Sequence, residues 1–243
     1  MNPGLSPAQL DQLAKYDSPT ICNAVELWNH RPRNLGYTNA ALKACFPQLP
    51  PMVGYALTST FRSMCPPRGG DVYGSIGAQL DAFESMPGPP VIVFQDIDEP
   101  VASATFGEVM CTTYQKFGAK GIVTSGAGRD LAQVEAIGFP AFTCGTIAAH
   151  GYCHILSINV PVTVGGVTIF PGDLLHGDLN GLTTIPPQFA SEVADVCEEI
   201  MRAEAIVLDY LKQPSVTVAG FNEARKACGD QINQLGKRLR GEL

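Results

Sequence analysis

The chain has 243 residues, of which 45% are hydrophobic and only 16% are charged, and its formal net charge is -7. This length allows one large domain with a sizeable core, and the negative charge argues against a nucleic-acid partner, because phosphate binding needs clustered lysines and arginines. No apolar run is long enough to cross a bilayer, and the polar residues 1–13 predict the start of a helix and not a secretion signal, so we expect a cytoplasmic protein with no membrane partner. The low charge content also suggests that sister subunits cover part of the surface.

The pattern of cysteines also favours a cytoplasmic protein. They are scattered, and none forms a Cys-x-x-Cys pair, which predicts reduced thiols and not a disulfide framework. The eight positions are Cys22, Cys45, Cys65, Cys111, Cys144, Cys153, Cys197 and Cys228.

The first quarter of the chain predicts a helix, a loop and a strand. Ser18 is followed by a proline and is the expected N-cap of a helix through ICNAVELW. Residues 31–51 are rich in Pro, Asn and Gly and predict a loop with one helical turn at most. Residues 54–62 alternate apolar and polar side chains as a half-buried strand does, and the sequence PPRGGD after them predicts a turn or a binding loop.

The next segments predict a helix at 76–85, a buried strand at 91–94 and a strand at 102–106. The acidic run after the second of these elements, which contains Asp96, Asp98 and Glu99, is expected to be a solvated loop. Gly107 and Glu108 then turn the chain into a helix with the sequence VMCTTYQKFGAK.

The stretch GIVTSGAGRD, residues 121–130, predicts a strand, a tight turn and the start of the helix LAQVEAIG. Asp130 stands where an N-cap would satisfy free N–H groups of that helix. Arg129 is harder to explain by capping. Its guanidinium is suited to gripping a carboxylate, and the adjacent carboxylate is suited to a hard divalent cation, so the pair could hold a small oxo-acid and its metal.

The rest of the chain predicts short strands followed by two helices. Gly165-Gly166 lies between two β-branched runs and is a strong hairpin signal. The expected strands lie at 140–143, 155–160 and 161–175, a turn lies at 178–181, and the helices lie at 187–212 and 221–240.

Three other motifs invite functional interpretations that we consider weaker. Gly126-Ala127-Gly128 is similar to a dinucleotide-binding turn, but Leu131 stands at the third glycine position. His150, Cys153 and His154 are close in sequence, yet no fourth zinc ligand is evident and ordinary loop histidines are favoured. Ser125 lacks the glycine two residues earlier that a hydrolase elbow requires.

Several motifs in order resemble the RraA-like family, which includes the 4-hydroxy-4-methyl-2-oxoglutarate / 4-carboxy-4-hydroxy-2-oxoadipate aldolases and the regulators of RNase E activity. The motifs are GEVM, GAKGIVTSGAGRD, EAIGFPAF and NVPVTVGGVTIFPGDLLHGDLNGLTTIP, with a looser match at SPTICNAV and RGGD. The resemblance implies a three-layer β/β/α sandwich with a partly closed sheet of the swivelling-domain type, flanked by N- and C-terminal helices. It further implies one domain over 1–243, with a core at about 18–186 and a helical extension at about 187–243, assembled as a homotrimer or homohexamer.

The resemblance also implies roles for individual residues. Arg129 matches the arginine that contacts pyruvate, and Asp130 matches the acid that holds a divalent metal, Mg²⁺ or Mn²⁺, largely through water. Glu108 falls on the second acidic position. The backbone donors to the substrate carboxylate fall at Val109 and Met110, and Gly107 is also expected to bind the substrate.

A glutamate from the C-terminal helix of a neighbouring subunit completes the metal site in the resembling aldolases. Glu204 is the expected counterpart in this chain, whereas Glu198 and Glu199 are expected to be solvated charges on the helix surface.

These residues imply a class II, metal-dependent aldolase. It would cleave a 4-hydroxy-2-oxo acid to release pyruvate, with oxaloacetate decarboxylation as a side activity, because both reactions form the pyruvate enolate. Two alternatives stay open: a non-catalytic regulator that binds an RNA-degrading enzyme, and a lyase or dehydratase of another hydroxy acid. The sequence does not identify the general base.

Overall fold

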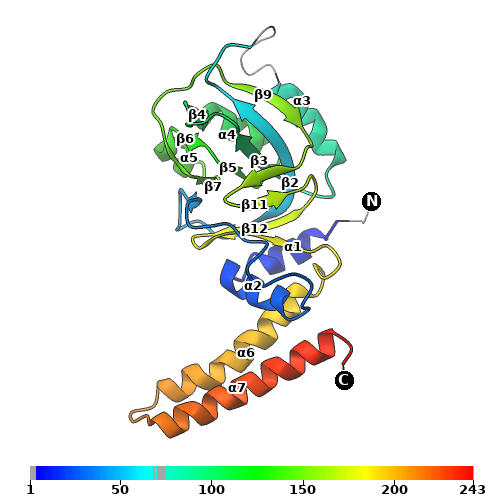
Figure 1. Cartoon of the computed structure of the whole chain (residues 1–243), viewed down its shortest axis with the longest axis vertical. Helices are drawn as coiled ribbons and strands as arrows, with labels where there is room; N and C mark the ends of the chain where they lie inside the picture. The colour runs from blue at the N-terminus through cyan, green and yellow to red at the C-terminus, as the bar shows by residue number, and fades with distance from the viewer. Residues whose placement is uncertain (1–3, 68, 70–74, 243) are drawn as a thin grey trace.

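A computed structural model, which describes residues 4–67, 69 and 75–242, shows a mixed α/β body from which two long C-terminal helices extend (Figure 1). Most of the predicted RGGD loop lies outside the described residues.

Within the described residues, the main sheet has eight strands in the order β1-β7-β5-β3-β2-β12-β13, with β9 paired to the second half of β2. Neighbours from β2 through β3 and β5 to β7 are parallel, and the other pairs are antiparallel. The strands are β1 (Lys43–Ala44), β2 (Met52–Arg62), β3 (Pro90–Asp96), β5 (Gly121–Thr124), β7 (Ala141–Thr143), β9 (His154–Ile158), β12 (Leu174–Asp178) and β13 (Gly181–Ile185).

The segment 36–45 connects the two ends of this sheet. The Thr38 N–H donates to the Leu182 carbonyl on β13 at 2.9 Å, and the Cys45 N–H donates to the Ala141 carbonyl on β7 at 2.8 Å. The sheet therefore nearly closes on itself, which confirms the predicted partly closed sheet with flanking helices.

Two smaller sheets complete the β structure. β4 (Ala104–Phe106), β6 (Ala127–Gly128) and β8 (Gly145–Thr146) pair in parallel, and β10 (Val162–Val164) pairs with β11 (Val167–Ile169) as an antiparallel hairpin. The hairpin turn has φ of 56° at Gly165 and 80° at Gly166, which L side chains rarely adopt. The predicted hairpin is confirmed.

Helices cover the outside of the sheets. α4 and α5 contribute side chains to a core against β2, β3 and β5, and the β10–β11 hairpin packs on the opposite face of these strands. Among the described residues, no helix is both long and apolar enough to span a bilayer. The helices are α1 (Pro7–Leu13), α2 (Ser18–Glu26), α3 (Ile76–Ala82) with the short η1 (Phe83–Ser85), α4 (Glu108–Lys116), α5 (Leu131–Ala136), α6 (Val193–Leu211) and α7 (Val218–Leu239).

Because both faces of the central strands are covered, β2 is buried along nearly its whole length. The expectation of a half-buried strand at 54–62 was therefore wrong. The polar side chains that suggested alternation are interior: Thr58 and Ser59 are fully buried, and the Ser59 hydroxyl accepts a hydrogen bond from the Gln79 amide at 2.7 Å. Interior hydrogen bonding, and not solvent, satisfies the polar positions of this strand.

Two other polar residues, Ser18 and Asp98, lie in the interior against expectation. Ser18 was expected to cap α2, but the cap is the preceding residue, Asp17, whose carboxylate accepts the Thr20 N–H at 2.8 Å. Ser18 is buried one residue further on, with its hydroxyl 3.0 Å from Nδ1 of His176. Asp98, expected in a solvated loop, is only 5% exposed.

Candidate functional site

The candidate site forms where two turns meet. β4 and β6 lie side by side, with Phe106 opposite Gly128, and the Arg129 N–H donates to the Phe106 carbonyl at 3.0 Å. The turn after β4 begins with Gly107, and the turn after β6 continues to Asp130. A Cβ at Gly107 would lie 2.5 Å from the Asp130 carboxylate, so a larger residue here would displace that side chain.

Asp130 occupies the N-cap position of α5, but its side chain does not cap that helix. The residue is left-handed, with φ 54° and ψ 36°, and its Oδ2 accepts the Glu108 N–H of α4 at 3.1 Å. The expectation that its carboxylate satisfies the first turn of α5 was therefore wrong. A left-handed aspartate costs about 1 kcal/mol or more, and here this conformation places the carboxylate at the start of α4.

Arg129 lies beside that carboxylate, with its Nε 3.7 Å from Asp130 Oδ2. The two side chains are 31% and 37% exposed, so this ion pair contributes little to stability. Among the described residues, no protein acceptor takes a hydrogen bond from the Arg129 guanidinium. Its planar set of N–H groups is suited to gripping a carboxylate.

The start of α4 provides further donors. In the first turn, the Glu108 N–H is taken by Asp130, whereas the Val109 and Met110 N–H groups have no acceptor within the described part of the chain. The positive end of the helix dipole lies at the same place. Backbone donors next to a guanidinium form an environment that favours a small anion.

A cavity of about 330 Å³ lies against these groups. Its charged side is formed by Arg129 and Asp130, and most of the remaining described lining is apolar. His150 also lines this cavity, from the loop between β8 and β9, and the sequence did not indicate that position. The described lining residues are Ile76, Ala104, Thr105, Phe106, Gly107, Val109, Met110, Arg129, Asp130 and His150.

The predicted residues differ in how they relate to this cavity. Gly107, Val109, Met110, Arg129 and Asp130 all line it. The Glu108 side chain is exposed and is not part of the described lining, whereas the Glu108 backbone N–H donates to Asp130.

Glu204 lies elsewhere. It belongs to α6, which extends to the opposite end of the molecule from α4 and α5 (Figure 1). Within a single chain, Glu204 therefore does not reach the cavity, and the structure places no residue of α6 in its described lining.

The donor set fits a hard cation and not a zinc ion. Asp130 Oδ1 has no protein partner among the described residues, and Glu108 adds a second carboxylate nearby. Magnesium is commonly held by one or two carboxylates, with water and ligand oxygens completing its shell. The described residues contain no group of three or more His, Cys, Asp or Glu that could hold a metal by themselves.

The alternative zinc motif is not assembled. The Cys153 thiol lies in the core and donates to the Ala104 carbonyl, at 3.7 Å. Nδ1 of His154 contacts the Tyr152 carbonyl at 2.7 Å. All eight cysteines are free thiols, as predicted.

The glycines of the central turn serve close packing and not phosphate binding. A Cβ at Gly128 would lie 2.5 Å from the Phe106 ring, and a Cβ at Gly126 would lie 2.5 Å from the Asp96 carboxylate. The Gly126 N–H is already bonded to the Thr124 hydroxyl at 3.0 Å. This accounts for a glycine-rich turn without a dinucleotide.

Together the fold and the site define a protein with a nearly closed α/β sheet and a cavity lined by Arg129, Asp130 and the first turn of α4. The family model described as Aldolase/RraA matches residues 18–184, most of the chain, and the chain therefore belongs to the RraA-like family.

Curated relatives match over shorter stretches. The chain is 39% identical over 105 residues to the "Putative 4-hydroxy-4-methyl-2-oxoglutarate aldolase" of Halalkalibacterium halodurans, which covers 43% of this chain and 49% of that protein. A protein of the same name from Ectopseudomonas mendocina is 32% identical over 105 residues, which covers 42% of this chain and 63% of that protein. The matched region thus spans about half the length of these relatives.

Solved structures support the fold. An uncharacterized protein from Pseudomonas syringae pv. tomato has a TM-score of 0.68 at 21% identity, with 92% of this chain and 95% of that chain covered. RraAS2 of Streptomyces coelicolor, described as an unusual member of the RNase ES inhibitor RraA protein family, has a TM-score of 0.64 at 24% identity, with 83% and 96% covered.

Proposed function

We propose that the protein is a divalent-metal-dependent lyase that cleaves the C3–C4 bond of a 4-hydroxy-2-oxo acid and releases pyruvate. The observation that carries this proposal is the convergence of Arg129, Asp130 and the first turn of α4 on one cavity of about 330 Å³. Membership of the RraA-like family, and relatives named for 4-hydroxy-4-methyl-2-oxoglutarate aldolase activity, agree with it.

Some of these residues would bind the substrate, and others would hold the cation that stabilises the developing negative charge. Arg129 would grip the carboxylate of the substrate, and the Val109 and Met110 N–H groups would donate to the same oxygens. A Mg²⁺ or Mn²⁺ held by Asp130 and, through water, by Glu108 would supply the positive charge that stabilises the developing enolate. A Schiff-base lysine is not required in this mechanism.

Oxaloacetate provides a second substrate that tests the same site. Loss of its C4 carboxylate as CO₂ leaves the same pyruvate enolate, so oxaloacetate decarboxylation is expected from the same residues. The RraA-type regulator of an RNA-degrading enzyme is the alternative, but a surface that only binds a protein has no need of Arg129 and Asp130 at a cavity.

The test is pyruvate release from a panel of 4-hydroxy-2-oxo acids and from oxaloacetate, before chelation, after exhaustive EDTA treatment and after return of Mg²⁺. We expect activity to disappear with the chelator and to return with the ion. Full activity after chelation would exclude the metal-dependent mechanism. A folded protein that releases no pyruvate from any member of the panel would exclude the lyase and favour the regulator.

We further propose that Glu204 completes the site of a neighbouring subunit in a trimer or hexamer. Its distance from the cavity in one chain means that only another copy could place it there. Mixing inactive Asp130→Ala and Glu204→Ala subunits should restore activity, because some interfaces then combine two intact halves. If subunits exchange and no activity returns, Glu204 has no such role.

A further inference from the structure

Retro-aldol cleavage needs a group that removes the proton of the C4 hydroxyl, and the residues named so far do not provide it. Three ionisable side chains occur in the described lining of the cavity: Arg129, Asp130 and His150. The arginine stays protonated, and the aspartate is assigned to the cation. Imidazole is the side chain most often used as a general base, because it exchanges its proton near neutral pH.

The backbone on both sides of His150 is hydrogen-bonded, on one side to β4 and on the other to the residue that follows β2. The Ala149 carbonyl accepts the Ala104 N–H of β4 at 3.0 Å, and the Tyr152 N–H donates to the Ser63 carbonyl at 2.9 Å. Gly151 packs closely against the Ser63 backbone, because a Cβ at this position would be 2.5 Å from the Ser63 carbonyl oxygen. The imidazole is therefore presented by a short loop that is anchored on either side of it.

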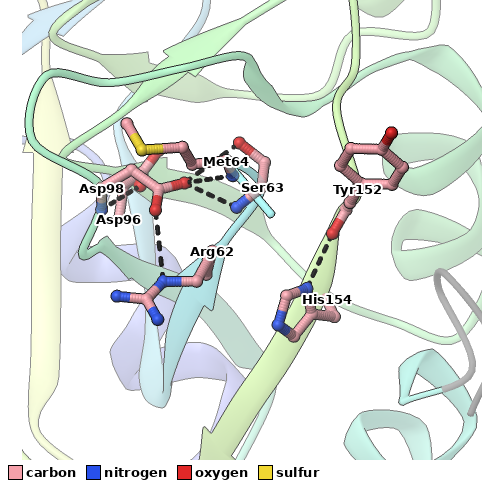
Figure 2. A network of polar contacts seen from close by, with 7 residues as sticks. All are labelled: Arg62, Ser63, Met64, Asp96, Asp98, Tyr152 and His154. Carbon is pink, nitrogen blue, oxygen red and sulfur yellow. Dashed lines mark hydrogen bonds and ion pairs between the residues drawn. The ribbon is translucent and has the colours of Figure 1, made fainter. Parts of the chain in front are cut away.

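A buried carboxylate holds the second anchor in place. Asp98 Oδ2 accepts the Ser63 and Met64 N–H groups at 2.6 and 2.8 Å, just beyond the end of β2. Figure 2 shows this network beside the segment that carries Tyr152. The contacts thus continue from Asp98 through Ser63 to Tyr152, two residues from His150.

One hydrogen bond of the His150 ring defines its tautomer. Nδ1 lies 3.0 Å from the Gly151 carbonyl oxygen, which can only accept a hydrogen bond. Nδ1 therefore carries the hydrogen in the neutral ring. In this tautomer the ring lone pair is on Nε2.

We propose that His150 is the general base of the reaction, an assignment that rests on the proposed lyase function. Nε2 takes the proton of the C4 hydroxyl, and the electron pair of that O–H bond forms the C4 carbonyl. The C3–C4 bond breaks, and its electron pair forms the C2–C3 double bond as negative charge passes to the C2 oxygen. The proton then returns from the imidazolium to C3, which gives pyruvate and leaves the histidine neutral.

Oxaloacetate distinguishes a general base from a residue that binds the substrate or the cation. Loss of CO₂ from oxaloacetate produces the enolate without removal of a hydroxyl proton, so a general base is not needed. The matched variants are His150→Asn and His154→Asn. His154 serves as the control because it lies on β9, bonds the Tyr152 carbonyl through its own Nδ1 and is absent from the described cavity lining (Figure 2).

We expect His150→Asn to lower kcat/KM for the 4-hydroxy-2-oxo acid by about 10²–10⁴-fold, the usual contribution of a general base. Its decarboxylation of oxaloacetate should stay close to that of the wild type, and His154→Asn should retain both activities. Free imidazole should partly restore cleavage in His150→Ala, an effect that a residue with a purely structural role would not show.

Three results would overturn the assignment: equal losses of both activities in His150→Asn, no loss of either, or no rescue by imidazole. If the wild type itself released no pyruvate from either substrate, the proposed function would fail first and His150 would lose its role with it.

Discussion

Two aspartates, each two residues beyond the end of a parallel strand, have opposite environments in this molecule. Asp98 follows β3, has a side chain that is 2% exposed, accepts two backbone N–H groups and lies 3.2 Å from the Arg62 guanidinium (Figure 2). Asp130 follows β6, has a side chain that is 37% exposed and accepts one N–H group.

The comparison shows that burial and the number of protein donors already bound separate a structural carboxylate from one that is available to a ligand. Asp98 holds the backbone at the end of β2, and removing it should affect stability. Asp130 keeps lone pairs directed to a cavity, and changing it should affect binding.

The largest expected effect is the loss of stability in Asp98→Ala. This change leaves the Arg62 charge, the buried Ser63 N–H and the partly buried Met64 N–H without an acceptor, so the free energy of unfolding should fall by about 3 kcal/mol. Urea unfolding measures it, with Asp130→Ala as the comparison, for which we expect a change within about 1 kcal/mol. Equal losses in the two variants would remove the distinction between the two aspartates.

Arg129→Lys should affect activity and leave the fold intact. Lysine keeps the charge but cannot form two parallel hydrogen bonds to a carboxylate, so transition-state stabilisation should fall by about 2–4 kcal/mol. The measurement is kcat/KM for pyruvate release at saturating Mg²⁺, with circular dichroism as the control for folding. A folded Lys variant with wild-type turnover would reduce Arg129 to a surface residue.

A smaller effect is expected from pH, through buried groups away from the cavity. Burial lowers the pKa of His176 below its ordinary value of 6.5. The unfolded chain therefore binds a proton below about pH 6.5 that the folded chain does not, and stability should fall on acidification by at most about 1.4 kcal/mol per pH unit.

Asp96 should act in the opposite direction. Burial raises the pKa of this carboxyl from 3.8 to about 6, so its contribution to stability is present below pH 3.8 and is lost as pH rises through about 6. Urea unfolding from pH 7 to 5 should show a steeper loss of stability in Asp96→Asn than in the wild type, and a shallower one in His176→Gln. Parallel pH profiles for all three proteins would contradict both assignments.

The sequence predicted those structural features that depend on residues close together in the chain. Gly165-Gly166 specified a hairpin turn, and apolar spacing specified α6 and α7. The resemblance to a family placed Gly107, Arg129 and Asp130 at one site, which chain order alone could not do, because β4 and β6 become neighbours only through the tertiary fold.

What the sequence could not show depends on distant contacts. Asp98 looked like a solvated acid because its partners, Ser63 and Met64, lie more than thirty residues away. His150 looked like an ordinary loop histidine because its position at the cavity depends on anchors in β4 and beyond β2. Asp130 was expected to cap its own helix, whereas its left-handed backbone directs the carboxylate to another.

The most direct test of the account is Mn²⁺ binding in the presence of pyruvate, followed by electron paramagnetic resonance in the wild type, in Asp130→Asn and in Asp98→Asn. Asparagine at 130 can still accept the Glu108 N–H but has no charge for the cation. The account predicts that the folded wild type and the folded Asp98→Asn variant bind Mn²⁺, whereas binding in Asp130→Asn is weakened at least about tenfold. Equal Mn²⁺ affinity in Asp130→Asn and the wild type would contradict the proposed cation site.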